Sequence, residues 1–307
     1  MNRADIQTLI ARHDLAALKK FGQNFLVDET IVDGIVRAAG VTKDDVILEI
    51  GPGPGTLTRA LAENAGHVVA VEIDLGLVAL LRETLADCDN VTVIEGDILE
   101  QDLASLAETH AHGAPLKVVA NLPYYITTPI LMRLLETGAA DGNAPVREIT
   151  VMVQDEVATR MQAQPGKKDY GALSLAVQYY ATCEKVLRVP PQSFYPAPKV
   201  ESAVVHLTRH AKKPVNVSDE AALFRLIRAA FNQRRKTFVN AVSEQWTTVF
   251  PAQSALSRDE VKTLLREALS SAYAEETARA ETLSLTQFAQ ICEAVQNSSH
   301  FPKSMLQ

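Results

Sequence analysis

The chain is predicted to fold as an α/β protein, a doubly wound Rossmann-like domain followed by a smaller C-terminal helical domain. From Val46 to about Val153, short apolar runs alternate with segments whose apolar residues recur at helical spacing, which is typical of βαβ units and a parallel sheet. Beyond a linker at Arg209–Val217, apolar residues recur only at helical spacing. The length of 307 residues suits two domains, which we expect at 1–208 and 209–307.

The individual elements of both domains can be placed along the sequence. Strands are expected at Val46–Ile50, His67–Glu72, Val91–Glu95, Leu116–Ala120 and Ile149–Val153, with helices between them at Thr56–Asn64, Leu75–Ala86, Asp102–Ala107 and Thr128–Thr137. A last strand is expected at Val200–Thr208, after the proline-rich passage Pro190–Pro198. The second domain should contain helices at Ala221–Val242, Arg258–Ala268 and Leu285–Gln296. Residues 2–20 suggest a mostly irregular or short-helical arm, followed by a helix from about Thr30 to Ala39.

Composition excludes several classes of protein. Hydrophobic residues make up 47% of the chain, enough for a sizeable core, so disorder is not expected. No apolar run approaches the length of a membrane span, and the charged N-terminus does not resemble a signal peptide. Three scattered cysteines and seven histidines without ligand spacing predict neither disulfides nor a metal site. We therefore expect a cytoplasmic, metal-free protein that does not associate with membranes, and a monomer.

Charge is distributed unevenly along the chain. The net charge of −7 is unfavourable for binding nucleic acid, yet residues 199–240 hold nine Lys/Arg against three acidic residues. A basic region on an otherwise acidic protein is expected of a catalytic domain joined to a region that binds RNA. Taken alone, the pattern fits a solvated surface of uneven charge equally well.

A glycine-rich turn follows the first predicted strand, in the stretch Glu49-Ile50-Gly51-Pro52-Gly53-Pro54-Gly55. Glycines at this place let the backbone turn sharply and approach a ligand closely. The dinucleotide fingerprint G-x-G-x-x-G would need glycine at Thr56, so an NAD-dependent dehydrogenase is disfavoured. The pattern E-x-G-x-G-x-G is typical of enzymes that use S-adenosylmethionine, and makes Gly51 and Gly53 candidate cofactor-binding residues.

Two carboxylates end the next two predicted strands. Glu72 ends the second strand, where a carboxylate can accept hydrogen bonds from both hydroxyls of a ribose. Asp97 closes the third strand, where an acid can accept a hydrogen bond from the amino group of an adenine. The carboxyl ends of adjacent parallel strands line one crevice, so both residues are expected beside the glycine turn.

The tetrapeptide Asn121-Leu122-Pro123-Tyr124 follows the fourth predicted strand. It resembles the N/D-P-P-Y motif of enzymes that methylate exocyclic amino groups of bases. The lone pair of adenine N6 is delocalised into the ring and is a poor nucleophile. An asparagine oxygen and a backbone carbonyl that each accept one N6–H would anchor the amine and direct its lone pair to the methyl donor. Asn121, Leu122 and Tyr124 are therefore candidate catalytic residues, with Tyr124 stacking on a flipped base.

Phe194, in the segment Ser193–Pro198, offers a second aromatic platform on a loop that prolines stiffen. We expect the target adenine to lie between Phe194 and Tyr124. The alternative is that Phe194 only packs within a proline turn.

Four basic residues are the candidates for RNA binding: Arg228, Arg234, Arg235 and Lys236. Successive helical residues turn by about 100°, so the three consecutive cations cannot all face the core of the expected helix. Those that face solvent would contact phosphates without reading bases. The alternative is a basic helix end that only stabilises the helix dipole.

Together these motifs identify a family. FGQNFL, EIGPGPGTLT, VEID, EGDIL, NLPYYITTPIL, KKDYGALSLAVQYY, FYPAPKVESAVV and FNQRRKTFVNAV resemble the ribosomal RNA small-subunit adenine dimethyltransferases, and RAETLSLTQFAQ resembles the C-terminal stretch of that family. The resemblance covers nearly the whole chain. It implies transfer of two methyl groups from S-adenosylmethionine to N6 of each of two adjacent adenosines near the 3′ end of small-subunit (16S) rRNA, with a role in assembly of the small ribosomal subunit.

The resemblance also assigns residues. It implies that Asn24, Leu26, Gly51, Glu72, Asp97 and Asn121 contact the methyl donor. Two positions depart from the family pattern: Tyr125 stands where bacterial members usually have asparagine, and Asp155 stands where lysine is common. These departures leave the donor positions intact but bear on the fit to RNA.

Two other functions remain as alternatives. A non-catalytic assembly or transcription factor could keep this fold, although the intact Asn121–Tyr124 motif with Glu72 and Asp97 argues against it. A sister class of enzymes methylates a large-subunit adenine and confers antibiotic resistance. The KKDYGALSLAVQYY block and the long helical C-terminal region favour the class linked to assembly.

Overall fold

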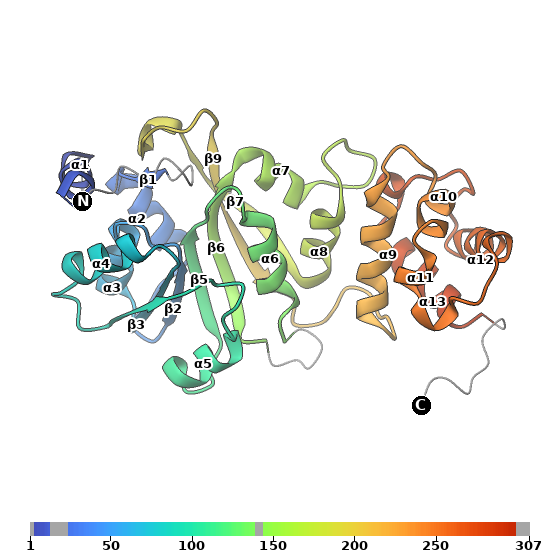
Figure 1. The fold of residues 1–307 in the computed structure, drawn as a ribbon, viewed down its shortest axis with the longest axis horizontal. Coiled ribbons are helices and arrows are strands. Elements are labelled where there is room, and N and C mark those ends of the chain that lie inside the picture. The colour runs from blue at the N-terminus through green and yellow to red at the C-terminus, as the bar shows by residue number, and fades with distance from the viewer. Residues whose placement is uncertain (1–2, 13–23, 139–143, 299–307) are drawn as a thin grey trace. The chain divides into compact units, whose positions relative to one another are not determined.

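A computed structural model of the chain describes residues 3–12, 24–138 and 144–298 (Figure 1). The chain divides into two compact units, the first formed by residues 1–158 and 181–209, the second by residues 159–180 and 210–307. The chain passes from the first unit to the second for the last time after Arg209, close to the predicted boundary. The segment Thr159–Tyr180, which we expected in the first domain, belongs with the second unit.

The first unit is built on a seven-stranded sheet. Its order is β4 (Val91–Glu95), β3 (His67–Glu72), β2 (Val46–Ile50), β5 (Leu116–Asn121), β6 (Val146–Gln154), β9 (Ser202–Arg209) and β7 (Ala181–Val189). The first five strands are parallel, and β9 runs antiparallel to both of its neighbours. The predicted parallel sheet is confirmed for these five strands. The direction of winding reverses between β2 and β5, which is where such sheets bind ligands.

Helices connect the parallel strands: α3 (Thr56–Asn64), α4 (Leu75–Thr84), α5 (Leu103–Ala111) and α6 (Thr127–Glu136). Crossovers between parallel strands are right-handed, so connections that move outward in opposite directions from the centre place their helices on opposite faces. The predicted doubly wound architecture is confirmed. Helix α7 (Asp155–Gln162) follows β6, at the point where the chain first leaves this unit.

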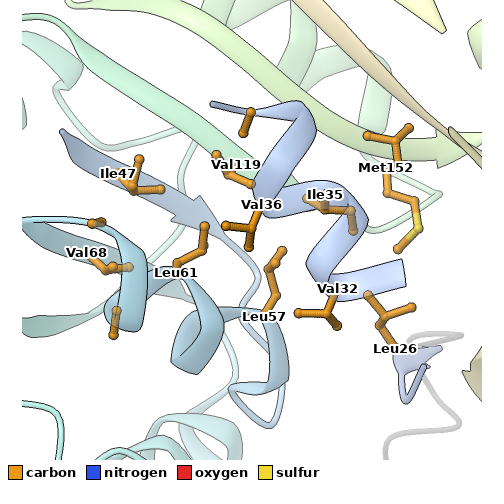
Figure 2. Packing of buried hydrophobic residues seen from close by; sticks show 14 of the residues in the cluster. Leu26, Val32, Ile35, Val36, Ile47, Leu57, Leu61, Val68, Val119 and Met152 are labelled. Atoms are coloured by element: carbon orange, nitrogen blue, oxygen red, sulfur yellow. The ribbon is translucent and has the colours of Figure 1, made fainter. Parts of the chain in front are cut away.

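One face of the sheet is covered by helix α2 (Glu29–Ala38), whose start is capped by Asp28. Val32, Ile35 and Val36 recur at helical spacing and are buried in a cluster with residues of α3 and of the central strands. Figure 2 shows Val36 facing the α3 side chains Leu57 and Leu61. This apolar layer fixes α3, and hence the glycine turn that precedes it, against the sheet.

A small second sheet lies in the first unit. β1 (Phe25–Leu26) pairs antiparallel with β8 (Phe194–Tyr195), which follows the 3-10 turn η2 (Pro191–Ser193). The backbone N–H of Val27 donates to the carbonyl of Ser193, and the Ser193 hydroxyl donates to Asp28 over 2.8 Å. The segment from Phe25 to Asp28 is thereby attached to the proline-rich passage. The predicted arm contains helix α1 (Arg3–Arg12), and its residues 13–20 lie outside the described part.

The second unit is helical. It contains α8 (Ala172–Tyr180), α9 (Glu220–Asn232), α10 (Phe238–Ser243), α11 (Trp246–Val249), α12 (Arg258–Ser271) and α13 (Leu285–Gln296), with 3-10 turns η3 (Pro251–Gln253) and η4 (Ala280–Thr282). Tyr179 and Tyr180 of α8 each lie 5.2 Å from the Phe224 ring of α9, measured between ring centroids. This aromatic packing explains why Thr159–Tyr180 belongs to the helical unit. Sequence spacing alone does not reveal it.

The prediction of a single helix at Ala221–Val242 is wrong. Helix α9 ends at Asn232, and α10 starts at Phe238 after a non-helical turn. Phe231 and Phe238 both contact the ring of Phe288, with centroids 6.1 Å and 5.9 Å away. Breaking the helix lets two aromatic rings share this partner, so tertiary packing overrides the helical pattern. No helix in the described part of the chain has the length and apolarity to cross a membrane.

Candidate active site

A cavity of about 250 Å³ lies at the carboxyl ends of β2, β3 and β5. Every residue predicted to bind the cofactor lines it: Asn24, Leu26, Gly51, Gly53, Glu72, Asp97 and Asn121. The candidate catalytic residues Leu122 and Tyr124 line it too. The structure therefore brings together two groups of residues that the sequence placed on separate strands. The fourth candidate, Phe194, is not among its lining residues.

The glycine turn needs its glycines. Gly51 and Gly53 have φ of +65° and +59°, in the left-handed region that favours glycine. A Cβ atom on Gly53 would lie 3.1 Å from the ring of Phe25. The turn can therefore pass close under β1, and its backbone forms one wall of the cavity.

Glu72 is buried, with only 3% of its surface exposed. One carboxylate oxygen accepts a hydrogen bond from the backbone N–H of Gly53 at 3.3 Å, and the other accepts from the N–H of Asp74 at 2.9 Å. Burial raises the pKa of Glu72, while these N–H groups oppose the rise. A carboxylate has about four acceptor positions, so Glu72 keeps acceptor capacity for a ligand.

Asp97 lies on the far side of β3, after β4. Its Oδ1 accepts a hydrogen bond from the N–H of Leu99 at 2.9 Å, which orients the side chain at the edge of the cavity. Ile73, which directly follows Glu72, also lines the cavity although 59% of its surface is exposed. Sequence reasoning did not select Ile73. Its position directly after Glu72, at the end of a strand, could have identified it as a candidate.

Glu49 is the second residue that sequence reasoning missed. It lines the cavity, is 1% exposed, and its Oε2 has no hydrogen-bond partner among the described residues. Burial raises its pKa to about 8; the Thr58 hydroxyl opposes the rise and the neighbouring Glu72 carboxylate adds to it. A buried carboxyl oxygen without a partner is costly, which indicates a site made for a cationic or hydrogen-bonding ligand.

Asn121 ends β5 on the opposite wall from Glu72. Its side-chain Nδ2 donates a hydrogen bond to the backbone carbonyl of Asn24 at 3.4 Å. Because the nitrogen is engaged there, the side-chain oxygen Oδ1 is the atom available as an acceptor. Leu122, the next residue, is buried, and its N–H donates to Met152 of β6 at 3.2 Å. The turn that follows β5 is thereby anchored on two sides.

Tyr124 is held in place by its hydroxyl, which lies 2.7 Å from the hydroxyl of Ser202. Ser202 begins β9 and is paired with Gln154 at the end of β6, so this contact lies at the same sheet edge as the cavity. Burial raises the pKa of Tyr124. The ring is thus a fixed wall of the cavity.

Phe194 is fully buried in the apolar cluster that contains Leu26 and Val32. It is paired with Leu26 across the β1–β8 ladder, one strand away from the cavity. The described position matches the packing interpretation of this residue. A stacking role would need the ring to leave the cluster.

The four basic candidates differ in their contacts. Arg234 donates to the carbonyls of Lys168 and Tyr170, at 2.8 Å and 3.0 Å, and forms an ion pair with Glu281. Lys236 pairs with Glu244 at 2.6 Å. Arg228 is exposed on α9. Arg235 is exposed and has no ion pair or hydrogen bond within the described ranges.

Lys167 and Lys168, which were not among the candidates, are exposed on the loop that Arg234 holds. Since Arg234 binds the Lys168 carbonyl and precedes Arg235 in the chain, the two lysines add exposed positive charge to this part of the second unit. Asp155, which stands where lysine is common in the family, forms an ion pair with Lys185 of β7. Within the parts of the chain that are described, His, Cys, Asp and Glu side chains form no group that could hold a metal ion.

Comparison with known proteins gives concordant results. Residues 15–277 match the family model described as ribosomal RNA adenine dimethylase. A ribosomal RNA small subunit methyltransferase A from Lachnoclostridium phytofermentans is 49% identical over 288 residues, which cover 94% of each chain. A crystal structure of a dimethyladenosine transferase from Plasmodium falciparum has a TM-score of 0.68 at 25% identity and covers 87% of this chain and 95% of that one. The structure of the 23S rRNA methyltransferase ErmE has a TM-score of 0.61 at 26% identity, over 89% of this chain and 100% of that one.

These matches extend over both structural units. They confirm the predicted fold, a Rossmann-like domain with a helical C-terminal region, and they confirm the resemblance found from the motifs. They also confirm that the chain is an enzyme of the methyltransferase class and exclude the dehydrogenase alternative. The chain belongs to the ribosomal RNA adenine dimethylase family.

Proposed function

We propose that this protein transfers methyl groups from S-adenosylmethionine to N6 of two adjacent adenosines near the 3′ end of small-subunit (16S) rRNA, giving N6,N6-dimethyladenosine. The observation that carries the proposal is the shared cavity, in which the glycine turn after β2 lies between Glu72 at the end of β3 and Asn121 at the end of β5. We place this activity in the cytoplasm, on a precursor of the small ribosomal subunit. The relative at 49% identity bears a small-subunit name, whereas ErmE, with a large-subunit name, is 26% identical.

The residues of the cavity fit the methyl donor. When bound, S-adenosylmethionine supplies an electrophilic methyl group on a positively charged sulfur. The free acceptor positions of Glu72 suit two ribose hydroxyls, and Asp97 suits an adenine amino group. Ile73 offers an exposed apolar face for the purine, beside Glu72. The unpartnered Oε2 of Glu49 suits the ammonium group of the methionine part, and Asn24 and Leu26 line the same cavity.

Asn121 and its neighbours would hold the target base. The Oδ1 atom of Asn121 accepts one N6–H of the adenine, and a backbone carbonyl of the Asn121–Tyr124 turn accepts the other. Tyr124, fixed through Ser202, stacks on the base. Phe194 remains a candidate for the opposite face. After methyl transfer the N6 proton is acidic and leaves to water, so the chain needs no general base.

The basic cluster of the second unit would bind RNA backbone. Arg235, Lys167 and Lys168 are exposed, and Arg234 holds the loop that carries the two lysines. We therefore assign phosphate contacts to Arg235 and the two lysines, with Arg228 and Lys236 beside them. Arg234 has a positioning role, which differs from the role expected from sequence.

Mass spectrometry of ribosomal RNA from cells with and without this gene tests the proposal. We expect N6,N6-dimethyladenosine in the small-subunit RNA of the parental cells and its loss when the gene is removed. Loss of a methylated adenine from the large subunit instead would support the sister class. Unchanged methylation of both RNAs would support a non-catalytic factor.

A further inference from the structure

Tyr125 is an exposed aromatic residue at the mouth of the cavity. It lines the cavity, yet 64% of its surface is exposed. Single exposed apolar residues are common and usually need no explanation. Tyr125 differs because its position is fixed by the turn that also holds the proposed catalytic residues.

The turn is rigid on both sides of Tyr125. The N–H of Ile126 donates to the carbonyl of Pro123 at 3.2 Å, and the Thr127 hydroxyl donates to the same carbonyl at 2.9 Å. Tyr124, the residue before, is tied to Ser202. Hydrogen bonds therefore hold the backbone on both sides of Tyr125, and its ring extends from an ordered turn.

The two adjacent tyrosines occupy different places. Tyr124 is a partly buried wall held by its hydroxyl, while the Tyr125 ring has no aromatic or hydrogen-bonding partner among the described residues. A base that enters the cavity to reach Asn121 meets Tyr124. The Tyr125 ring is therefore available to a base that stays outside the cavity while the target base is inside it.

We propose that Tyr125 stacks on the unpaired base next to the target adenosine and thereby positions the RNA strand at the cavity mouth. This inference rests on the proposed function. Every base has a π-face, so an exposed aromatic ring is a sequence-tolerant platform for a single strand. When one of two adjacent adenosines is in the cavity, the other is the nearest base available to Tyr125.

The test uses full-length protein and small-subunit particles. Tyr125→Ala should lower kcat/KM for the particles about 5- to 150-fold, the range expected for loss of one stacked base, with unchanged affinity for S-adenosylmethionine. Tyr125→Phe keeps the ring and should restore parental values. Leu75→Ala removes a side chain that is 65% exposed at the start of α4 and does not line the cavity, so it should leave kcat/KM unchanged.

A double-mutant cycle identifies the stacked base. Particles reconstituted with an abasic nucleotide next to the target should react more slowly with the parental protein, and Tyr125→Ala should add little further loss on them. If the two losses simply multiply, or if Tyr125→Ala equals the parental protein on intact particles, the inference is wrong while the proposed function stands. A parental protein that does not methylate intact particles overturns both.

Discussion

The side-chain nitrogen of Asn121 donates its hydrogen bond to the backbone carbonyl of Asn24, 97 residues earlier in the chain. This contact joins the end of β5 to the residue that precedes β1, and both residues line the cavity. It fixes the orientation of the amide, so that the oxygen remains as the acceptor. A residue predicted to bind the donor thus orients a residue predicted to hold the target base.

Asn121→Ala should reduce the rate of methyl transfer by about a hundredfold or more, because it removes a group that holds the amine in attack geometry. Single-turnover rates on small-subunit particles measure this step. Asn121→Asp keeps an acceptor oxygen and should lose less than Asn121→Ala. Near-normal single-turnover rates in the alanine variant would contradict the role.

The parallel strands could be predicted closely from sequence because a buried strand is a short apolar run with sharp ends. β2, β3 and β4 have the expected bounds. β7 was not predicted because Glu184, Lys185 and Arg188 interrupt its apolar pattern, and pairing with β9 holds it in the sheet. An edge strand needs less apolar surface than a central one, so its pattern is weaker.

Features set by distant contacts could not be read from local patterns. The burial of Phe194 depends on pairing between β1 and β8, which lie far apart in sequence. The end of α9 depends on Phe288, and the role of Arg234 depends on carbonyls of the 168–170 loop. The motifs at Gly51, Glu72, Asp97 and Asn121 led to one cavity because each lies at or just after the end of a parallel strand, and the ends of parallel strands meet.

Glu72→Ala should weaken binding of the methyl donor about ten- to a hundredfold. The ribose hydroxyls lose a charged partner worth roughly 1.5–3 kcal/mol. Glu72→Gln keeps one acceptor oxygen and should fall between alanine and the parental protein. Calorimetry gives the affinities, and unchanged donor affinity in the alanine variant would eliminate this role for Glu72.

Phe194→Leu should lower the melting temperature, because a fully buried ring is replaced by a smaller side chain at a cost of about 1 kcal/mol. The proposed stacking role predicts in addition that RNA methylation falls about 5- to 150-fold while donor affinity is unchanged. The two assays are made on protein that is folded at the assay temperature. If donor affinity falls and methylation survives, Phe194 is a packing residue that supports Leu26.

Binding of the donor should release a proton from Glu49. Its pKa of about 8 means that the carboxyl group is mostly neutral at pH 7 in the free protein. A cationic ammonium nearby favours the charged form and lowers this pKa, so donor affinity should rise with pH below about 8. Calorimetry at pH 7 in buffers of different ionisation enthalpy measures the released proton. Glu49→Gln should abolish the release, and its absence in the parental protein would exclude the ammonium contact.

Substitution of Arg235 should change the salt dependence of RNA binding, whereas substitution of Arg234 should change stability. Arg235 is exposed without a partner in the described residues, so Arg235→Gln should flatten the slope of log affinity against log salt for small-subunit particles by roughly one unit. Arg234 donates to Lys168 and Tyr170, so Arg234→Gln should lower the melting temperature by loosening that loop.

Donor affinity is the control for both variants and should equal the parental value, since neither residue lines the cavity. Lys167→Gln with Lys168→Gln should flatten the salt slope further, because both lysines are exposed and the backbone of Lys168 is bound by Arg234, the residue next to Arg235. A parental salt slope in Arg235→Gln and in the double lysine variant would show that this cluster does not contact phosphates. RNA binding would then have to be sought at Arg12, or at Lys19 and Lys20 outside the described part of the chain.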